Sequence, residues 1–303
     1  MSDAFGLISA LLVAAAAPQT AAAGPPADSV AVAQAGVNLE WPEPPSSARY
    51  RVGELLLVMS NDVDRNDPSI LRRSLRIELP GFSAFTIDPG EDDAHEPAVM
   101  VVATPSGAPT ILFQTYSGGA HCCTSTTAIA PRDGRLEGVL VYRGDGGPIE
   151  EAPSDLDGDG RIDFVRPDNA FLYRFASYAD SYAPPRIVNV VGGEAVDVSG
   201  RPGFRPLFEE AMREAGAVCT EAGNSAPNGA CAGYVAAAAR LGRFDEAWAR
   251  MLSAYDRTSD WGLEGGCRVQ VTDGSCPPGQ EQSFASYPEA LRHFLIETGY
   301  IER

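Results

Sequence analysis

Lysine is absent from this 303-residue chain, so all 23 of its basic residues are arginine. The sequence therefore cannot supply the lysine of a phosphate-binding loop, a Schiff base or a kinase-type ATP site. Positive charge is scarce as well, because 41 acidic residues against 23 arginines give a formal net charge of −18. A surface with this net negative charge repels phosphate groups. We therefore do not expect nucleic acids or anionic membranes as partners.

Histidine and the familiar catalytic motifs are also scarce. The chain has 3 histidines, and it contains neither a Gly-x-Ser-x-Gly elbow nor a His-Glu-x-x-His helix motif. These absences favour a binding or structural module over an enzyme. A hydrolase that uses Ser117 and His121 remains an alternative.

Long apolar runs are missing too. Phe5–Ala17 is uncharged but shorter than the roughly 20 residues that cross a bilayer. The run fits the apolar part of a secretory signal, with Ala21-Ala22-Ala23 as the cleavage site. We therefore expect residues 1–23 to be a signal peptide and the mature protein to be periplasmic or secreted.

Cysteine usage agrees with an oxidising compartment. Proximity favours the pairs Cys219–Cys231 and Cys267–Cys276, whose short loops would each contribute about 2–3 kcal/mol in the chain-entropy model. Cys122 and Cys123 are then left over as neighbours. No cysteine pair shows the repeated two-residue spacing of a structural zinc site.

The chain divides by composition and periodicity. Residues 24–48 are rich in Ala, Pro and Ser and predict a flexible spacer. Residues 49–200 carry short Val-, Ile-, Phe- and Tyr-rich runs between turn residues, which predict an antiparallel all-β domain, either a sandwich or a partial propeller. The expected strands are 54–59, 75–79, 98–104, 110–116, 124–129, 136–142, 171–177 and 186–191.

Helical periodicity replaces this pattern in residues 201–303. Two helices are expected over residues 204–215 and 234–241. Asp245 caps a third, and the fourth begins at Pro288 and ends at Gly299. The overall fold class is therefore α+β, with a small disulfide-bonded helical region. One stretch, ARLGRFDEAWARML, resembles a tetratricopeptide-type hairpin, but a single unit is too few for a solenoid.

The most specific motif is Asp-Leu-Asp-Gly-Asp-Gly-Arg-Ile-Asp at residues 155–163. Acids at alternate positions of a tight loop can turn inward together, and Gly160 permits the sharp bend. A set of oxygen ligands this dense selects Ca²⁺ over zinc or copper. We expect structural calcium with an affinity on the order of 10⁻⁵–10⁻³ M, the alternative being an ion-free acidic turn. The expected ligands are Asp155, Asp157, Asp159, the carbonyl of Arg161, and Asp163.

The flanks of this loop differ from an EF-hand. Arg166 replaces the bidentate Glu of position 12, and Ile162, Phe164 and Val165 indicate a strand and not a helix. Over Ser154–Asp168 the segment resembles the calcium loops of FG-GAP and VCBS-type blades, as in integrin α-subunit propellers. The resemblance is local, covers one good copy of the loop, and implies a calcium ion held between strands.

A second unusual segment runs Ser-Gly-Gly-Ala-His-Cys-Cys from Ser117 to Cys123. Neighbouring residues of a strand point to opposite faces, so Cys122 and Cys123 can bond to each other only in a distorted turn. A vicinal disulfide that stiffens a functional loop is the favoured interpretation. Pairing with a remote cysteine, a thiol activated by His121, and a soft-metal site made from His121 and a thiolate are the alternatives.

The segment is similar to one in uncharacterised secreted bacterial proteins. Together, these features favour a calcium-stabilised extracytoplasmic module that binds a protein or a glycan. A thiol-redox enzyme or a hydrolase that uses residues 117–123 is the alternative function.

Overall fold

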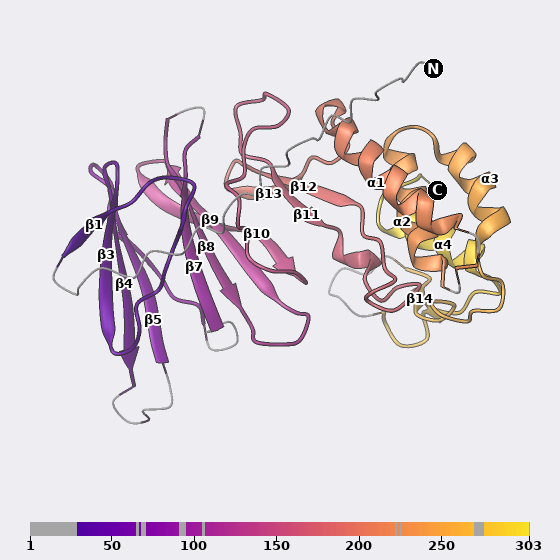
Figure 1. The fold of residues 1–303 in the computed structure, drawn as a ribbon, viewed down its shortest axis with the longest axis horizontal. Coiled ribbons are helices and arrows are strands. Elements are labelled where there is room, and N and C mark those ends of the chain that lie inside the picture. The colour runs from indigo at the N-terminus through magenta and orange to yellow at the C-terminus, as the bar shows by residue number, and fades with distance from the viewer. Residues whose placement is uncertain are drawn as a thin grey trace, which may run out of the picture.

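The structure is a computed structural model. It describes residues 29–64, 67, 71–90, 95–104, 107–221, 223–224, 226–269 and 276–302, with only the backbone described at positions 95 and 96. Sheets fill the first two thirds of the chain and helices the last third, which confirms the α+β class. Figure 1 shows the sheets at one end of the molecule and the helices at the other. The predicted signal peptide, residues 1–23, lies outside the described residues.

Two five-stranded sheets form the N-terminal part as a sandwich. The first has the order β1-β3-β4-β5-β6 and the second the order β10-β9-β8-β7-β2. The first comprises β1 Val30–Val32, β3 Ser46–Val52, β4 Leu55–Val63, β5 Leu71–Glu78 and β6 Phe85–Ile87. The second comprises β2 Asn38–Leu39, β7 His95–Val102, β8 Thr110–Tyr116, β9 Thr124–Arg132 and β10 Arg135–Gly144.

The sandwich core lies between these sheets. Leu57 and Ile77 from the first sheet pack in one cluster with Val99 and Ile111 from the second. Strand β4 shows why one face of each sheet is buried. Its buried and less buried residues alternate along the strand with a period of two, so every second side chain points into the core. All strand pairs in the two sheets are antiparallel except β1 with β3, which is parallel.

The flexible spacer predicted for residues 24–48 is wrong over its described part. Residues 29–48 form β1, β2 and the start of β3, and Leu39 is buried in the sandwich core. Trp41 packs against Phe113 with ring centroids 6.1 Å apart. The few apolar side chains of this Pro-rich segment complete sheet edges, which the composition alone does not reveal.

A third sheet, β11-β12-β13, lies between the sandwich and the helices (Figure 1). It consists of β11 Phe164–Pro167, β12 Pro185–Val191 and β13 Glu194–Asp197. Phe164 and Val188 pack with Met100 of the sandwich, whereas the adjacent Ile187 packs among the helices. Strand β12 therefore contributes to two cores.

The strand predicted over 171–177 is wrong. Asn169–Phe171 is a short 3-10 helix, η1, followed by turns. Phe171 and Phe175 enter the helical core, with ring centroids 4.9 and 5.4 Å from that of Phe294. The aromatic residues that suggested a strand are instead anchors for the helices.

The helical region consists of η2 Pro202–Phe204, α1 Arg205–Cys219, α2 Asn228–Arg240, α3 Phe244–Ala254 and α4 Tyr287–Glu297, with the short strands β14 Gly266–Cys267 and β15 Glu281–Gln282. Helix α2 is buried along most of its length, which its alanine and glycine side chains permit. The α2–α3 hairpin lies where the tetratricopeptide-like stretch predicts one. Among the described helices, none combines the length and apolarity needed to cross a bilayer.

Candidate functional site

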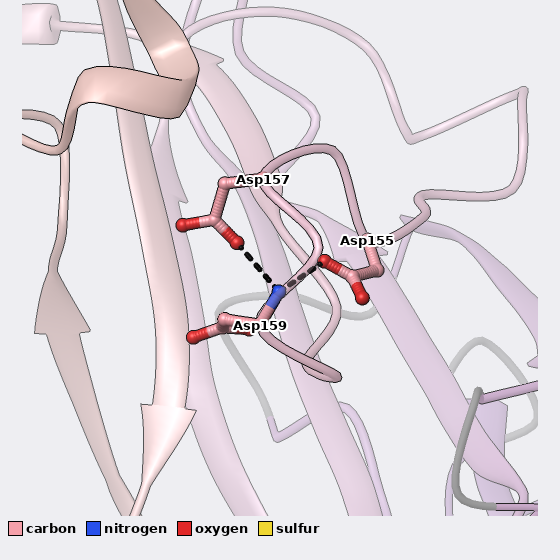
Figure 2. A group of neighbouring side chains, drawn as sticks. All are labelled: Asp155, Asp157 and Asp159. Carbon is pink, nitrogen blue, oxygen red and sulfur yellow. Dashed lines mark hydrogen bonds between the residues drawn. The ribbon is translucent and has the colours of Figure 1, made fainter.

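The acidic loop, residues 155–163, lies between the last strand of the sandwich, β10, and β11. The Asp163 amide donates to the Ser154 carbonyl at 2.9 Å and closes the loop. Gly158 and Gly160 have φ angles of +78° and +85°, a region in which a residue with a Cβ is strained. Carboxylate oxygens of Asp155, Asp157 and Asp159 lie within 4.8 Å of one another. Figure 2 shows these three side chains on the loop. The structure thus brings together three of the five predicted ligands.

Backbone amides of the loop hold these carboxylates in place. The amides of Gly158 and Gly160 donate to the two oxygens of Asp155, each at 2.8 Å. The Asp159 amide donates to Asp155 and Asp157, at 3.1 Å in both cases (Figure 2). These bonds fix the positions of the Asp155 and Asp157 carboxylates relative to the loop backbone.

Asp163 has a different position from the other acids. Its side chain is buried, and one oxygen accepts from the Leu156 amide at 2.7 Å and from the Asp157 amide at 3.4 Å. The other oxygen accepts from Asn189 Nδ2 at 2.6 Å. Asp163 therefore fixes the loop backbone from inside and lies outside the three-carboxylate group.

Arg161 donates hydrogen bonds to Asp159 from both its side chain and its amide. Its guanidinium donates to Asp159 Oδ2 at 3.0 Å and its amide to Asp159 Oδ1 at 2.9 Å. The Arg161 carbonyl stays a predicted ligand.

Arg201 completes the site, although no sequence signal points to it. Its Nη1 donates to Asp157 Oδ2 at 3.1 Å, to Asp159 Oδ2 at 2.5 Å and to Asn189 Oδ1 at 3.2 Å. Desolvation acts to raise the pKa of Asp159, but hydrogen bonds from Arg201 and Arg161 outweigh it and hold that pKa below its usual value. Arg201 neutralises part of the carboxylate charge from a position more than 40 residues along the chain.

The donor chemistry of this group fits calcium. Three carboxylates at alternate positions offer hard oxygen atoms within 4.8 Å of one another, the kind of ligand that calcium prefers. The guanidinium of Arg201 contacts two of these carboxylates, so a bound divalent cation would share them with Arg201 or displace it. Asp155 accepts no hydrogen bond from Arg201 among the described ones, and its two oxygens are instead held by the amides of Gly158, Asp159 and Gly160.

The Ser117–Cys123 segment forms a closed loop between β8 and β9. Cys122 and Cys123 are bonded to each other, as the favoured interpretation expects, and Cys219–Cys231 and Cys267–Cys276 are also bonded. No free cysteine remains among the described residues. Neither a remote partner for Cys122 or Cys123 nor a free reactive thiol is therefore present in this structure.

Ser117 stabilises this loop. Its hydroxyl donates to the Cys122 carbonyl at 2.7 Å and accepts from the Cys123 amide at 2.6 Å. Its own amide donates to the Cys123 carbonyl at 3.0 Å. A Cβ at Gly119 would lie 2.3 Å from the Cys122 carbonyl oxygen, which explains the glycine there. These bonds give Ser117 a positioning role and not the free hydroxyl of a nucleophile.

His121 faces aromatic side chains of the segment that follows η1. Its ring centroid lies 4.4 Å from that of Tyr178, and Tyr178 lies 5.6 Å from Tyr173. A pocket of about 300 Å³ opens beside them, with Gln114, Asp145, His121 and Tyr178 in its wall. The sequence places His121 in a candidate functional loop, but the two tyrosines fall in the segment predicted as a strand or just after it.

Comparison with known proteins connects the helical region to a described family. Residues 208–299 match the family model of the sll0997 C-terminal domain. A probable thylakoid lumen protein, sll0997, from a Synechocystis strain is 41% identical over 198 residues, which cover 64% of this chain and 57% of that protein. An uncharacterized protein, y4bJ, from Sinorhizobium fredii is 31% identical over 263 residues, which cover 83% of this chain and 40% of that protein.

The chain thus spans about half the length of the curated relatives it matches. No solved structure matches it. The acidic loop and the vicinal disulfide both precede the residues that match the family model.

Proposed function

We propose that this protein is an extracytoplasmic, non-enzymatic binding module whose β region is stabilised by calcium. The observation that carries the calcium part is the close grouping of the carboxylates of Asp155, Asp157 and Asp159. Its local resemblance to FG-GAP and VCBS-type loops supports the same ion. Three disulfides and a relative called a probable thylakoid lumen protein support an extracytoplasmic location, periplasmic or secreted.

Calcium would act on the junction between the sheets and the helices. The carboxylates of the loop repel one another, and of the three grouped carboxylates Arg201 contacts those of Asp157 and Asp159. A divalent ion would remove the remaining repulsion and fix the loop against the turn that precedes η2. At a calcium concentration about 100 times the dissociation constant, the folded state gains about 2.7 kcal/mol.

The test is a metal analysis combined with thermal unfolding of the mature protein. We expect one calcium ion per chain after dialysis against calcium. We also expect the melting temperature to fall by about 5–10 °C with a chelator, from about 2–4 °C per kcal/mol for a chain of this size. Asp155→Asn should remove both the bound ion and the effect of the chelator.

Asp133→Asn is the matched control, because Asp133 is an exposed turn acid with φ +47°, a conformation that asparagine accepts readily. It should keep the wild-type response to calcium. A protein that contains no calcium and melts at the same temperature with and without chelator would contradict the proposal.

A further inference from the structure

Three aromatic rings gather beside the vicinal disulfide. The ring centroids of His121 and Tyr178 lie 4.4 Å apart with the two planes tilted by 33°. Tyr173 extends this surface, with its centroid 5.6 Å from that of Tyr178 and 6.3 Å from that of His121. Tyr173 is 48% exposed and His121 is exposed as well. Grouped aromatic surface that faces solvent is a mark of a ligand site more than of a core.

The backbone conformation of Tyr173 is a second indication of a ligand site. Its φ angle is +59°, a region that bulky side chains avoid. Two bonds hold it there, because its amide donates to Ser181 Oγ at 3.1 Å and its carbonyl accepts from Trp261 Nε1 at 2.9 Å. Backbone conformations of this kind persist where the surrounding structure enforces them, and they cluster at ligand sites.

The wall of the pocket next to these rings is polar. Asp145 is only 7% exposed and lies beside Tyr178. Desolvation, followed by the charge of and hydrogen bond to Asp145, raises the pKa of Tyr178. Gln114 lines the same pocket, whose volume of about 300 Å³ suits one or two sugar rings.

The disulfide makes the aromatic side of this pocket rigid. Cys122 and Cys123 are bonded directly behind His121, and Ser117 ties both of their backbones to the start of the loop. A wall that is already ordered loses little conformational entropy when a ligand binds.

We infer that this pocket binds the pyranose ring of a neutral sugar, which deepens the proposed binding function by naming its site and ligand class. The apolar C–H face of the ring would lie on Tyr178 and His121, and its hydroxyls would bond to Asp145 and neighbouring polar groups. The acidity of the chain disfavours anionic sugars. A quaternary ammonium held over the same ring faces is the other ligand class, and the choline titration below distinguishes it.

The test uses the mature protein and isothermal titration with maltose, cellobiose and N,N′-diacetylchitobiose. Choline and glucuronate serve as charged probes. We expect at least one neutral disaccharide to bind, and Tyr178→Ala and His121→Ala each to weaken that binding about tenfold or more. Phe244→Ala, which removes a ring of the stacked pair on α3, is the matched control and should bind as the wild type does.

Absence of binding by every neutral disaccharide up to about 10 mM would overturn the inference. Preferential binding of choline or glucuronate would overturn the ligand class, and wild-type affinity in both pocket variants would overturn the site. Titrations with calcium and with chelator separate this inference from the proposed function. A failure of sugar binding in a protein whose melting still responds to calcium overturns the pocket alone.

Discussion

Gly203 lets the helical region close onto the acidic loop, and its replacement by alanine should weaken calcium binding. A Cβ at Gly203 would lie 2.4 Å from the Cβ of Asp157 and 3.1 Å from its Cα. The Cα of Asp157 belongs to the backbone, so the clash cannot be relieved by rotating a side chain. Either η2 or the acidic loop has to move.

The size of the effect follows from this overlap. Forcing an extra methyl group into a packed contact costs about 1–3 kcal/mol. An ion-free loop can shift Asp157 to relieve part of this cost, whereas a calcium-bound loop needs that carboxylate in place. Most of the cost should therefore fall on the calcium-bound state, and the dissociation constant for calcium should rise by about 5–150-fold.

Calorimetric titration with calcium and thermal unfolding with and without chelator would measure both parts of this effect. Gly200→Ala is the matched control, because a Cβ at Gly200 would meet nothing within 4 Å. Wild-type calcium affinity and wild-type melting in Gly203→Ala would refute the close contact. An equal fall in melting temperature with and without calcium would refute the coupling between η2 and the loop.

Other predictions concern single interactions. Arg201→Gln removes the guanidinium that contacts Asp157 and Asp159, so the calcium-free variant should have a lower melting temperature than the calcium-free wild type. In calorimetry, the difference in melting temperature between the calcium-free and the calcium-bound protein should be larger for the variant. Serine at both Cys219 and Cys231, which are separated by 12 residues, should cost about 3 kcal/mol and speed hydrogen exchange in α1 and α2 more than in the sandwich. Burial acts to raise the pKa of Asp197, but hydrogen bonds from Ser199 and the ion pair with Arg186 lower it. Asp197 therefore stabilises the fold above its unfolded pKa of about 3.9. In urea unfolding, Asp197→Asn should be less stable than the wild type at neutral pH, and this difference should disappear as the pH falls below that value. Ellman titration of the unreduced, denatured protein should find no thiol, and a free thiol would favour the redox alternative.

Features that depend on neighbouring residues could be predicted from the sequence. The acidic loop follows from the spacing of Asp155, Asp157 and Asp159 and from the bend at Gly160. The local disulfides follow from short loops, and the α+β class follows from a change in apolar periodicity near residue 200.

Features that depend on distant residues could not be predicted. Arg201 reaches the acidic loop only because η2 packs against it, and nothing in its own neighbourhood marks it as a partner of Asp157. Tyr173 and Tyr178 look like residues of a strand and its continuation, but the tertiary structure turns them toward His121. Leu39 and Trp41 lie in a Pro-rich segment whose strands exist only because two sheet edges accept them.

The small sheet β11-β12-β13 limits how this molecule can be cut. Ile187 on one side of β12 fills the helical core, and Val188 on the other side fills the cluster shared with the sandwich. A fragment that starts at residue 201 would lack Phe171, Phe175 and Ile187, and it would expose the apolar surface that these side chains cover. A fragment that starts ahead of β11 keeps the helical core but exposes Phe164 and Val188, which pack with Met100 of the sandwich. Gene fusion or limited proteolysis would therefore uncover apolar surface at either cut, because the small sheet belongs to both interiors.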